Sequence, residues 1–309
     1  METRTIGPLE VSAVGLGCNN FGGRIDEAAT ASVVHAALDA GITLFDTADV
    51  YGKGLSEEYL GKALRGRRDE AVIATKFGIE MPGGSGASPE WIEQAVADSL
   101  RRLGVDHIDL YQLHAPDDDT PVEATIAALD GLVTAGAVRA VGCSNVTAEW
   151  LDATLGISAE RDLSGWVTVQ NHYSLLHREP EGDGVLDACA RHGLGMLPYF
   201  PLASGMLTGK YRAGETPPEH TRLGAIPAER ASKFMNDEAF ATVERLQRFS
   251  DRHGRSLLEL AFGYLLSRPE VASVIAGATR PEQIEANVAA GGWRLTEEEM
   301  AEVALLAAG

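Results

Sequence analysis

Four residues of this chain have side chains that together suit proton transfer. Asp46 ends the apolar segment TLFD, and Lys76 directly follows AVIAT. His114 follows IDLYQL, and Tyr51 stands five positions after Asp46. A phenol has an ordinary pKa of about 10, and an ammonium within ~4–6 Å lowers that pKa by favouring the phenolate. We therefore predict acid–base chemistry at Tyr51. In this arrangement Lys76 supplies the ammonium, Asp46 orients and neutralises it, and a carbonyl is polarised or positioned by His114.

Other polar residues occupy the same kind of position, directly after an apolar segment. Ser144 and Asn145 follow AVGC, Gln170 follows VTV, and Gly277, Thr279 and Arg280 come at the end of the last segment. Each alone has an ordinary structural explanation, such as a helix cap or a core hydrogen bond. Burying several of them without partners would cost about 1–3 kcal/mol each, so we expect one connected polar network.

The elements that must position this network follow from the alternation of apolar and amphipathic segments. The apolar segments are SAVGLGC, TLFD, AVIAT, HIDLYQLH, VRAVGCS, WVTVQ, GMLPYF and VASVIAG. They are short and rich in β-branched residues and leucine, as strands buried on both faces should be. Such alternation is typical of βα units around a parallel sheet. We predict an α/β fold, a (β/α)₈ TIM barrel, in which the ends of the strands meet at one rim.

Helices are predicted at 27–40, 56–64, 89–103, 121–135 and 148–155. Ser88 before Pro89 is a typical N-cap, and glycines at 41, 104 and 136 stand where helices should end. Three features lie outside the repeat: an N-terminal hairpin (TRTIG, then PLEVSAV), a long loop at 208–230, and a C-terminal helix that begins with the capping box Thr296 to Glu299. No linker divides the chain, so we predict a single domain over 1–309.

Composition narrows the range of partners. The chain has 309 residues, 45% of them hydrophobic and 23% charged, with a formal net charge of −19. That charge repels phosphate backbones and anionic membrane surfaces, so neither nucleic acid nor a membrane is expected as a partner. Three widely separated cysteines and the absence of a signal sequence favour a cytoplasmic protein. Nothing in the sequence indicates an oligomeric state.

A series of motifs resembles the aldo-keto reductase family, in family order and over nearly the whole chain. They are GITLFDTADVYG, ATKFG, LYQLHAPD, VGCSN, VQNHYSLL, YFPLASGMLTGKY and IAGATRPEQIEAN. The spacing of residues after Tyr51 and the long loop after Tyr211 resemble those of the family's bacterial and channel-subunit branches. The resemblance implies a reductase that uses NADPH, with NADH possible, to reduce a small carbonyl compound reversibly to an alcohol.

The resemblance also implies site residues. Asp46, Tyr51, Lys76 and His114 match the family's catalytic set, with Tyr51 as the general acid. Ser144, Asn145 and Gln170 match residues that hold the carboxamide of the cofactor, and Tyr199 matches the aromatic residue that stacks on the nicotinamide. The remaining cofactor matches are Leu202, Ser204, Leu207 and Lys210 at the pyrophosphate, and Gly277, Arg280, Gln283 and Asn287 at the adenosine. Phe21 and Phe77 are candidate substrate contacts, together with Tyr51 and His114.

One departure from the family pattern concerns the adenosine phosphate. Many members have Lys-Ser where this chain has Gly277 and Ala278. Two phosphate contacts are therefore missing, and Arg280 must carry more of the charge recognition.

Other site types match less well. GLGCNNFGG does not fit the GxGxxG turn, and GCSNV lacks the second glycine of a GxSxG elbow. No metal is expected, because His172 and His177 are the nearest histidine pair to a ligand spacing and the acidic run 117–119 lacks the alternating oxygens of a calcium loop. Two alternatives stay open: a lyase that uses Lys76 as a Schiff-base amine, and a nicotinamide-binding regulatory module with little turnover.

Overall fold

Eight parallel strands form one continuous sheet in this computed structural model, which describes residues 1–308. The order is β10-β3-β4-β5-β6-β7-β8-β9. The strands are β3 (Val14–Gly17), β4 (Leu44–Asp46), β5 (Val72–Phe77), β6 (Ile108–Leu113), β7 (Val138–Ser144), β8 (Thr168–Gln170), β9 (Gly195–Met196) and β10 (Val274–Gly277). A parallel bridge from Met196 to Val271 joins β9 to the segment before β10. The sheet thus closes, and the prediction of a TIM barrel is confirmed.

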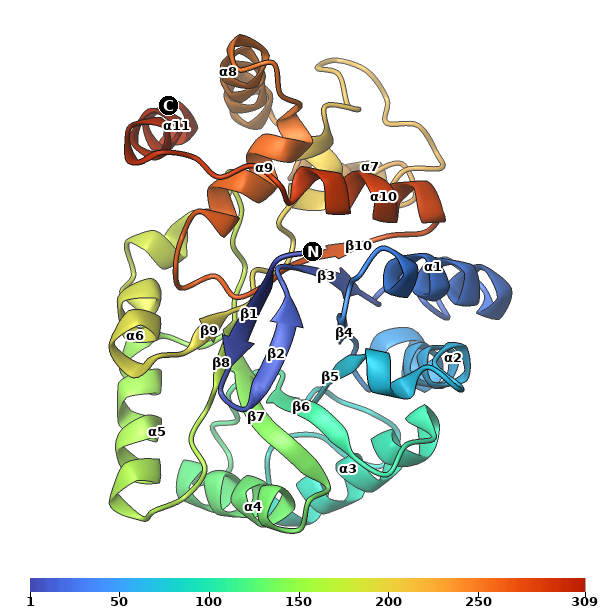
Figure 1. Cartoon of the computed structure of the whole chain (residues 1–309), viewed down its shortest axis with the longest axis vertical. Helices are drawn as coiled ribbons and strands as arrows, with labels where there is room; N and C mark the ends of the chain where they lie inside the picture. The colour runs from blue at the N-terminus through green and yellow to red at the C-terminus, as the bar shows by residue number, and fades with distance from the viewer. Residues whose placement is uncertain (309) are drawn as a thin grey trace.

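The N-terminal hairpin covers one end of this barrel (Figure 1). Strands β1 (Thr3–Ile6) and β2 (Leu9–Ser12) pair antiparallel, as the sequence predicted. Their apolar side chains join a buried cluster with residues on or directly after the barrel strands, namely Leu44, Ala74, Leu110, Leu197 and Ile275. Val72 and Val167, at or before the start of their strands, pack against that cluster. The hairpin therefore closes the amino end of the strands and leaves the carboxyl end free for a site.

Helices surround the sheet (Figure 1). They are α1 (Glu27–Asp39), α2 (Leu55–Ala63), α3 (Pro89–Leu103), α4 (Val122–Thr134), α5 (Ala148–Glu160), α6 (Val185–His192), α7 (Ala228–Ser232), α8 (Asp237–Arg252), α9 (Leu257–Leu266), α10 (Pro281–Ala290) and α11 (Glu297–Ala308). The predicted ends of α1 to α4 are right to about one residue. The prediction for α5 stopped too early, because Gly156 does not end the helix and Ile157 and Ser158 continue its buried face.

Capping residues act as the sequence indicated. The Ser88 hydroxyl accepts a hydrogen bond from the Trp91 N–H at 3.3 Å, and Gly104 ends α3 in the left-handed conformation with φ of 66°. Thr296 and Glu299 form the predicted capping box, with reciprocal bonds of 2.8 and 3.2 Å. Helix α11 lies beside α8 on the outside of the barrel (Figure 1), as expected.

The long loop predicted at 208–230 is largely confirmed. It contains no strand, but its last residues belong to α7, so Arg230 is helical rather than part of the loop.

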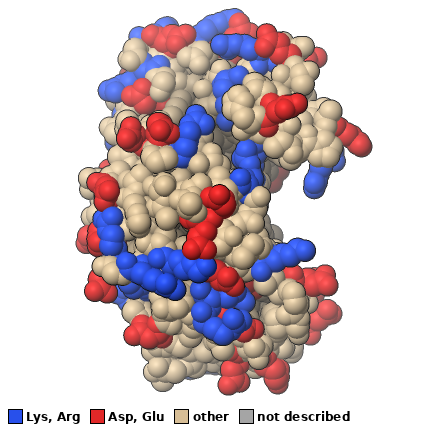
Figure 2. All heavy atoms as spheres, turned by 90° about the vertical axis from the view of Figure 1, so that its right-hand side faces the viewer, with Lys and Arg blue, Asp and Glu red and all other residues tan. Residues whose placement is uncertain are grey.

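The molecular surface carries acidic and basic side chains interspersed over the face drawn in Figure 2, despite the net charge of −19. Among residues 1–308, no helix is long and apolar enough to cross a membrane.

Candidate active site

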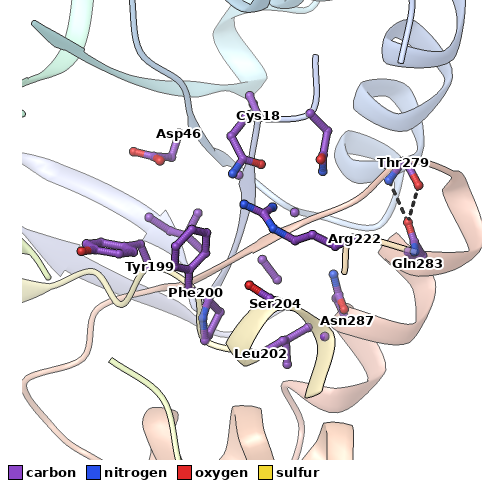
Figure 3. A pocket seen from close by; sticks show the side chains of 18 of the residues that line it. Cys18, Asp46, Tyr199, Phe200, Leu202, Ser204, Arg222, Thr279, Gln283 and Asn287 are labelled. Carbon is purple, nitrogen blue, oxygen red and sulfur yellow. Dashed lines mark hydrogen bonds between the residues drawn. The ribbon is translucent and has the colours of Figure 1, made fainter. Parts of the chain in front are cut away.

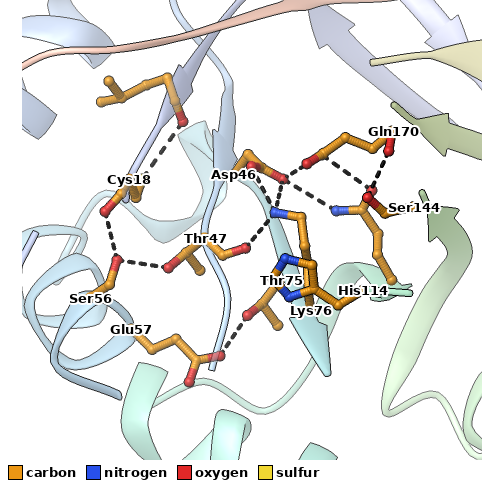
Figure 4. Close-up of polar contacts among 12 residues, drawn as sticks. Cys18, Asp46, Thr47, Ser56, Glu57, Thr75, Lys76, His114, Ser144 and Gln170 are labelled. Atoms are coloured by element: carbon orange, nitrogen blue, oxygen red, sulfur yellow. Dashed lines mark hydrogen bonds and ion pairs between the residues drawn. The ribbon is translucent and has the colours of Figure 1, made fainter. Parts of the chain in front are cut away.

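A buried ion pair lies at the carboxyl ends of β4 and β5. The Lys76 ammonium donates to both carboxylate oxygens of Asp46, at 2.8 Å each, and to the Thr47 carbonyl at 2.8 Å (Figure 4). Lys76 is 0% exposed and Asp46 only 4% exposed. Burial disfavours the ammonium, but attraction to the Asp46 carboxylate prevails, and the pKa of Lys76 is raised. Lys76 therefore stays charged.

Two glutamine amides complete the shell around Asp46. Gln170 Nε2 donates to Asp46 Oδ1 at 2.8 Å, and Gln112 Nε2 donates to the same oxygen at 3.2 Å. Gln112 was not singled out from the sequence. It could have been recognised, because neighbouring residues of a strand face opposite sides, and Gln112 shares the inward face of β6 with Leu110.

The Tyr51 phenol ring lies over this ion pair. The Lys76 nitrogen is 5.3 Å from the ring centroid, and the ring meets the His114 imidazole edge to face at 6.0 Å. Burial raises the pKa of Tyr51, and the Lys76 ammonium offsets only part of that rise. The sequence-based expectation of a lowered phenol pKa is therefore wrong in its net direction. Tyr51 is held protonated, which is the form that a proton donor requires.

His114 stands beside Tyr51 as a neutral imidazole. Burial and the nearby Lys76 charge lower the pKa of His114 to about 3. Its carbonyl accepts a hydrogen bond from Asn145 Nδ2 at 2.8 Å, and Asn145 Oδ1 in turn accepts from the Tyr199 hydroxyl at 2.8 Å. The Ser144 hydroxyl donates to the Gln170 carbonyl at 2.6 Å. The strand ends thus form one connected polar network.

A cavity of about 590 Å³ opens above this network (Figure 3). Most of the residues expected at a site line it: Asp46, Tyr51, His114, Ser144, Asn145, Gln170, Tyr199, Leu202, Ser204, Lys210, Gly277, Arg280, Gln283 and Asn287. Its lining therefore runs from the phenol of Tyr51 to the first turns of α10. Lys76 does not reach the lining, since its ammonium is enclosed by its three acceptors.

Three expected contacts lie outside this cavity, each for a physical reason. Phe77 follows the inward-facing Lys76 on β5, so its side chain points to the opposite face and stacks on Tyr111 at 4.7 Å. Phe21 is 0% exposed, in a turn where its N–H bonds back to the Cys18 carbonyl. Leu207 is likewise fully buried in the core. The expectations of substrate contact by Phe21 and Phe77, and of cofactor contact by Leu207, are therefore corrected.

Basic residues from separate segments converge on the cavity, and sequence reasoning missed two of them. Arg222, on the long loop, stacks its guanidinium 4.8 Å from the Phe200 ring and reaches into the cavity (Figure 3). Arg24 lines the same cavity and donates to the His220 carbonyl at 3.4 Å. Burial, with the like charge of Arg24, lowers the pKa of Arg222. A bound anion would relieve that repulsion. Only the Arg-rich character of the loop signalled this role.

The far end of the cavity is formed by the start of α10. Arg280 is the N-cap residue, its side chain is 60% exposed, and its Nε lies 3.6 Å from Glu282 Oε2. Gln283 Oε1 accepts from both the N–H and the hydroxyl of Thr279, at 2.7 and 3.1 Å (Figure 3). A helix N-terminus with an exposed cation beside it suits a phosphate group.

These features define an oxidoreductase of the barrel type, and comparison with known proteins identifies its family. The model of the aldo/keto reductase family matches residues 13–307, so the chain belongs to this family. It is an oxidoreductase that acts on carbonyl or CH–OH groups, and members of the family typically depend on NAD(P)H.

Individual relatives agree with this assignment. The chain is 34% identical to the aldo-keto reductase YhdN of Bacillus subtilis over 96% of its own length and 89% of the relative's. It is 33% identical to a probable voltage-gated potassium channel subunit beta of Arabidopsis thaliana, over 94% and 91%. The solved structure of the aldo-keto reductase AKR11C1 from Bacillus halodurans, in its holo form, superposes with a TM-score of 0.81 at 33% identity, covering 99% of this chain and 96% of that one.

The residues present fit a nicotinamide dinucleotide. The cavity volume lies in the usual range for cofactor sites, about 300–1,000 Å³. Four cations line it, namely Arg24, Lys210, Arg222 and Arg280, as an elongated anion requires. Among residues 1–308, no group of three or more His, Cys, Asp or Glu side chains is arranged to hold a metal ion.

Proposed function

We propose that this protein reduces the carbonyl of a small aldehyde, ketone or sugar with NADPH, reversibly, and that residues 1–309 work as one domain. The bound cofactor would supply the hydride. The observation that carries the proposal is geometric: Tyr51 and His114 line the cavity with their rings edge to face at 6.0 Å, and the buried Lys76 nitrogen lies 5.3 Å from the Tyr51 ring centroid.

Each of the four residues has a distinct task in this proposal. Tyr51 donates its proton to the carbonyl oxygen as negative charge develops there. The Lys76 ammonium stabilises the phenolate left behind, and Asp46 holds Lys76 in position. His114 is uncharged and donates a hydrogen bond to the same carbonyl oxygen, which orients the substrate.

The cofactor contacts are proposed from the lining of the cavity. Ser144, Asn145 and Gln170 hold the carboxamide, and Tyr199 stacks on the nicotinamide ring. Lys210, Leu202 and Ser204 hold the pyrophosphate, without Leu207, which lies outside the lining. Gln283 and Asn287 contact the adenosine beside Gly277, and Arg280 binds the ribose phosphate that distinguishes NADPH from NADH.

The Schiff-base alternative fares worse. A lysine nucleophile must be unprotonated and must reach the substrate, whereas Lys76 is charged, fully buried and outside the cavity lining. The regulatory alternative keeps support from the resemblance to channel subunits.

One experiment tests the proposed function. The purified protein is incubated with NADPH, or with NADH, and a panel of aldehydes, ketones and sugars, while the absorbance of the reduced nicotinamide is followed. We expect turnover with NADPH that exceeds turnover with NADH. Tight NADPH binding with negligible turnover across the panel would favour the regulatory module instead.

A further inference from the structure

Three aromatic rings form a column behind one wall of the cavity. The imidazoles of His177 and His172 are stacked at 3.8 Å with an interplanar angle of 10°, and His172 is stacked on Tyr199 at 5.3 Å and 11°. Tyr199 lines the large cavity and His172 does not. His172 therefore covers the side of the Tyr199 ring that faces away from the cavity.

The backbone places the three rings of this column side by side. His172 and Tyr199 are partners in a parallel bridge that extends the pairing of β8 and β9, so their side chains stand next to each other. A tight turn with bonds of 2.9 and 3.1 Å between Ser174 and His177 returns the second imidazole to the first. The parallel bridge and the tight turn thus together form the stack of three rings.

A second, smaller cavity lies behind this column of rings. Its volume is about 140 Å³, and it is lined in part by His172, His177 and Phe234. Without the imidazole of His172, the Tyr199 ring would have room to tilt toward that cavity. The Tyr199 hydroxyl is held by Asn145 at 2.8 Å, but that single bond leaves the ring plane free to rotate about it.

The charge state of the column suits stacking rather than proton transfer. Burial, with His177 beside it, lowers the pKa of His172 to about 4, so the central ring is neutral in the physiological range. Glu179 Oε2 lies 3.5 Å from His177 Nε2, and Lys233 lines the small cavity. The neutral central ring keeps the stack free of a repelling charge next to Tyr199.

We propose that His172 and His177 are positioning residues for the nicotinamide ring of the cofactor. They fix the plane of Tyr199, and Tyr199 then presents a preformed flat wall on which the nicotinamide stacks. His177 acts only through His172: it stacks on the His172 ring, and the His172 ring stacks on Tyr199. The inference rests on the proposed function, in which Tyr199 carries the nicotinamide.

The test compares two ligands that differ by the nicotinamide half. Dissociation constants for NADPH and for adenosine 2′,5′-bisphosphate are measured for wild type, His172→Ala, His172→Phe, His177→Ala and the double alanine variant. The matched control is His253→Ala, which removes an imidazole packed at a tilt against Phe249, with ring centroids 4.3 Å apart, at the C-cap of α8 and away from the cavity.

We expect His172→Ala to weaken NADPH about three- to tenfold and the bisphosphate less than twofold, since a stacked pair contributes at about this level. His172→Phe keeps a ring and should restore NADPH binding to within about twofold, which a mutant that merely misfolds cannot explain. His177→Ala should cost about two- to threefold, and the double variant should match His172→Ala alone. His253→Ala should leave both constants unchanged.

Two results would overturn the inference. If wild type binds NADPH but His172→Ala weakens both ligands equally or neither, the column does not position the nicotinamide, while the proposed function stands. If wild type binds NADPH no more tightly than adenosine 2′,5′-bisphosphate, the nicotinamide half contributes no affinity. The proposed function then fails, and the inference fails with it.

Discussion

The proposed chemistry depends on two side-chain groups, the phenol of Tyr51 and the ammonium of Lys76. Replacing Tyr51 by Phe keeps the ring against His114 and removes only the hydroxyl. We expect kcat to fall at least about 100-fold, the low end of what a general acid contributes, with little change in NADPH affinity. Rapid kinetics and a fluorescence titration separate the two effects. Retained turnover would contradict the assignment of Tyr51.

Arg280 decides cofactor preference in the proposed site. The two cofactors differ by one phosphate, and Gly277 and Ala278 offer no charge to it. A charge-assisted Arg–phosphate contact contributes roughly 1.5–3 kcal/mol, so Arg280→Ala should lower the preference for NADPH over NADH by about one to two powers of ten. Titrations with both cofactors at matched ionic strength measure this. Equal weakening of both would shift the phosphate role to Lys210 or Arg222.

Asp49 links stability to pH. Its Oδ1 is buried without a hydrogen-bond partner among the described residues, and burial together with Glu57 raises the pKa of Asp49 to about 7. Because this folded-state pKa lies above the unfolded value of about 3.9, the folded protein binds the extra proton, and stability falls as pH rises from about 4 through 7.

Asp49→Asn should therefore raise the melting temperature at pH 8 and make it less dependent on pH between 5 and 8. Thermal unfolding at several pH values, with the exposed Asp118→Asn as control, checks this. An unchanged pH dependence would mean that Asp49 is ionised in the folded protein.

Between elements, helix α2 approaches the end of α3 closely at Gly61. A Cβ on Gly61 would lie 2.0 Å from the Leu103 carbonyl oxygen, and backbone at a helix end cannot easily move away. Gly61→Ala should destabilise the protein by about 1–3 kcal/mol. Gly156, inside α5, has no atom within 4 Å of its Cβ position, so Gly156→Ala should stabilise by up to about 1 kcal/mol. Urea unfolding of both variants measures the contrast, and equal effects would refute it.

For the whole molecule, the barrel separates stability from chemistry. Leu9 on the hairpin is 1% exposed and packs at the amino end of the strands, whereas Asp46, Ser144 and Gln170 lie at the carboxyl end. We expect Leu9→Ala to lower the free energy of unfolding by about 2–5 kcal/mol and to leave kcat unchanged at low temperature. Denaturant unfolding and steady-state rates test this together. A large loss of kcat in the folded variant would show that the two ends are coupled.

Local pattern alone determined much of this protein. Alternating apolar and amphipathic segments predicted the barrel, because strands buried on both faces need uninterrupted apolar runs. Closure of parallel strands then brings their ends to one rim, which is why the positions of Asp46, Lys76 and His114 after such runs predicted a shared network. Capping at Ser88 and Thr296 was equally readable, since these bonds join residues three positions apart.

Tertiary structure decided what depends on burial and on contacts distant in sequence. The rise in the pKa of Tyr51 comes from desolvation, which no spacing reveals. Phe77 lies outside the cavity because its neighbour on β5, Lys76, faces the inside of the barrel, so Phe77 faces the opposite side. Arg222 reaches the cavity only because the long loop brings it against Phe200, and His172 meets His177 only through a turn. Each depends on the path of the folded chain, and neighbouring residue types do not specify that path.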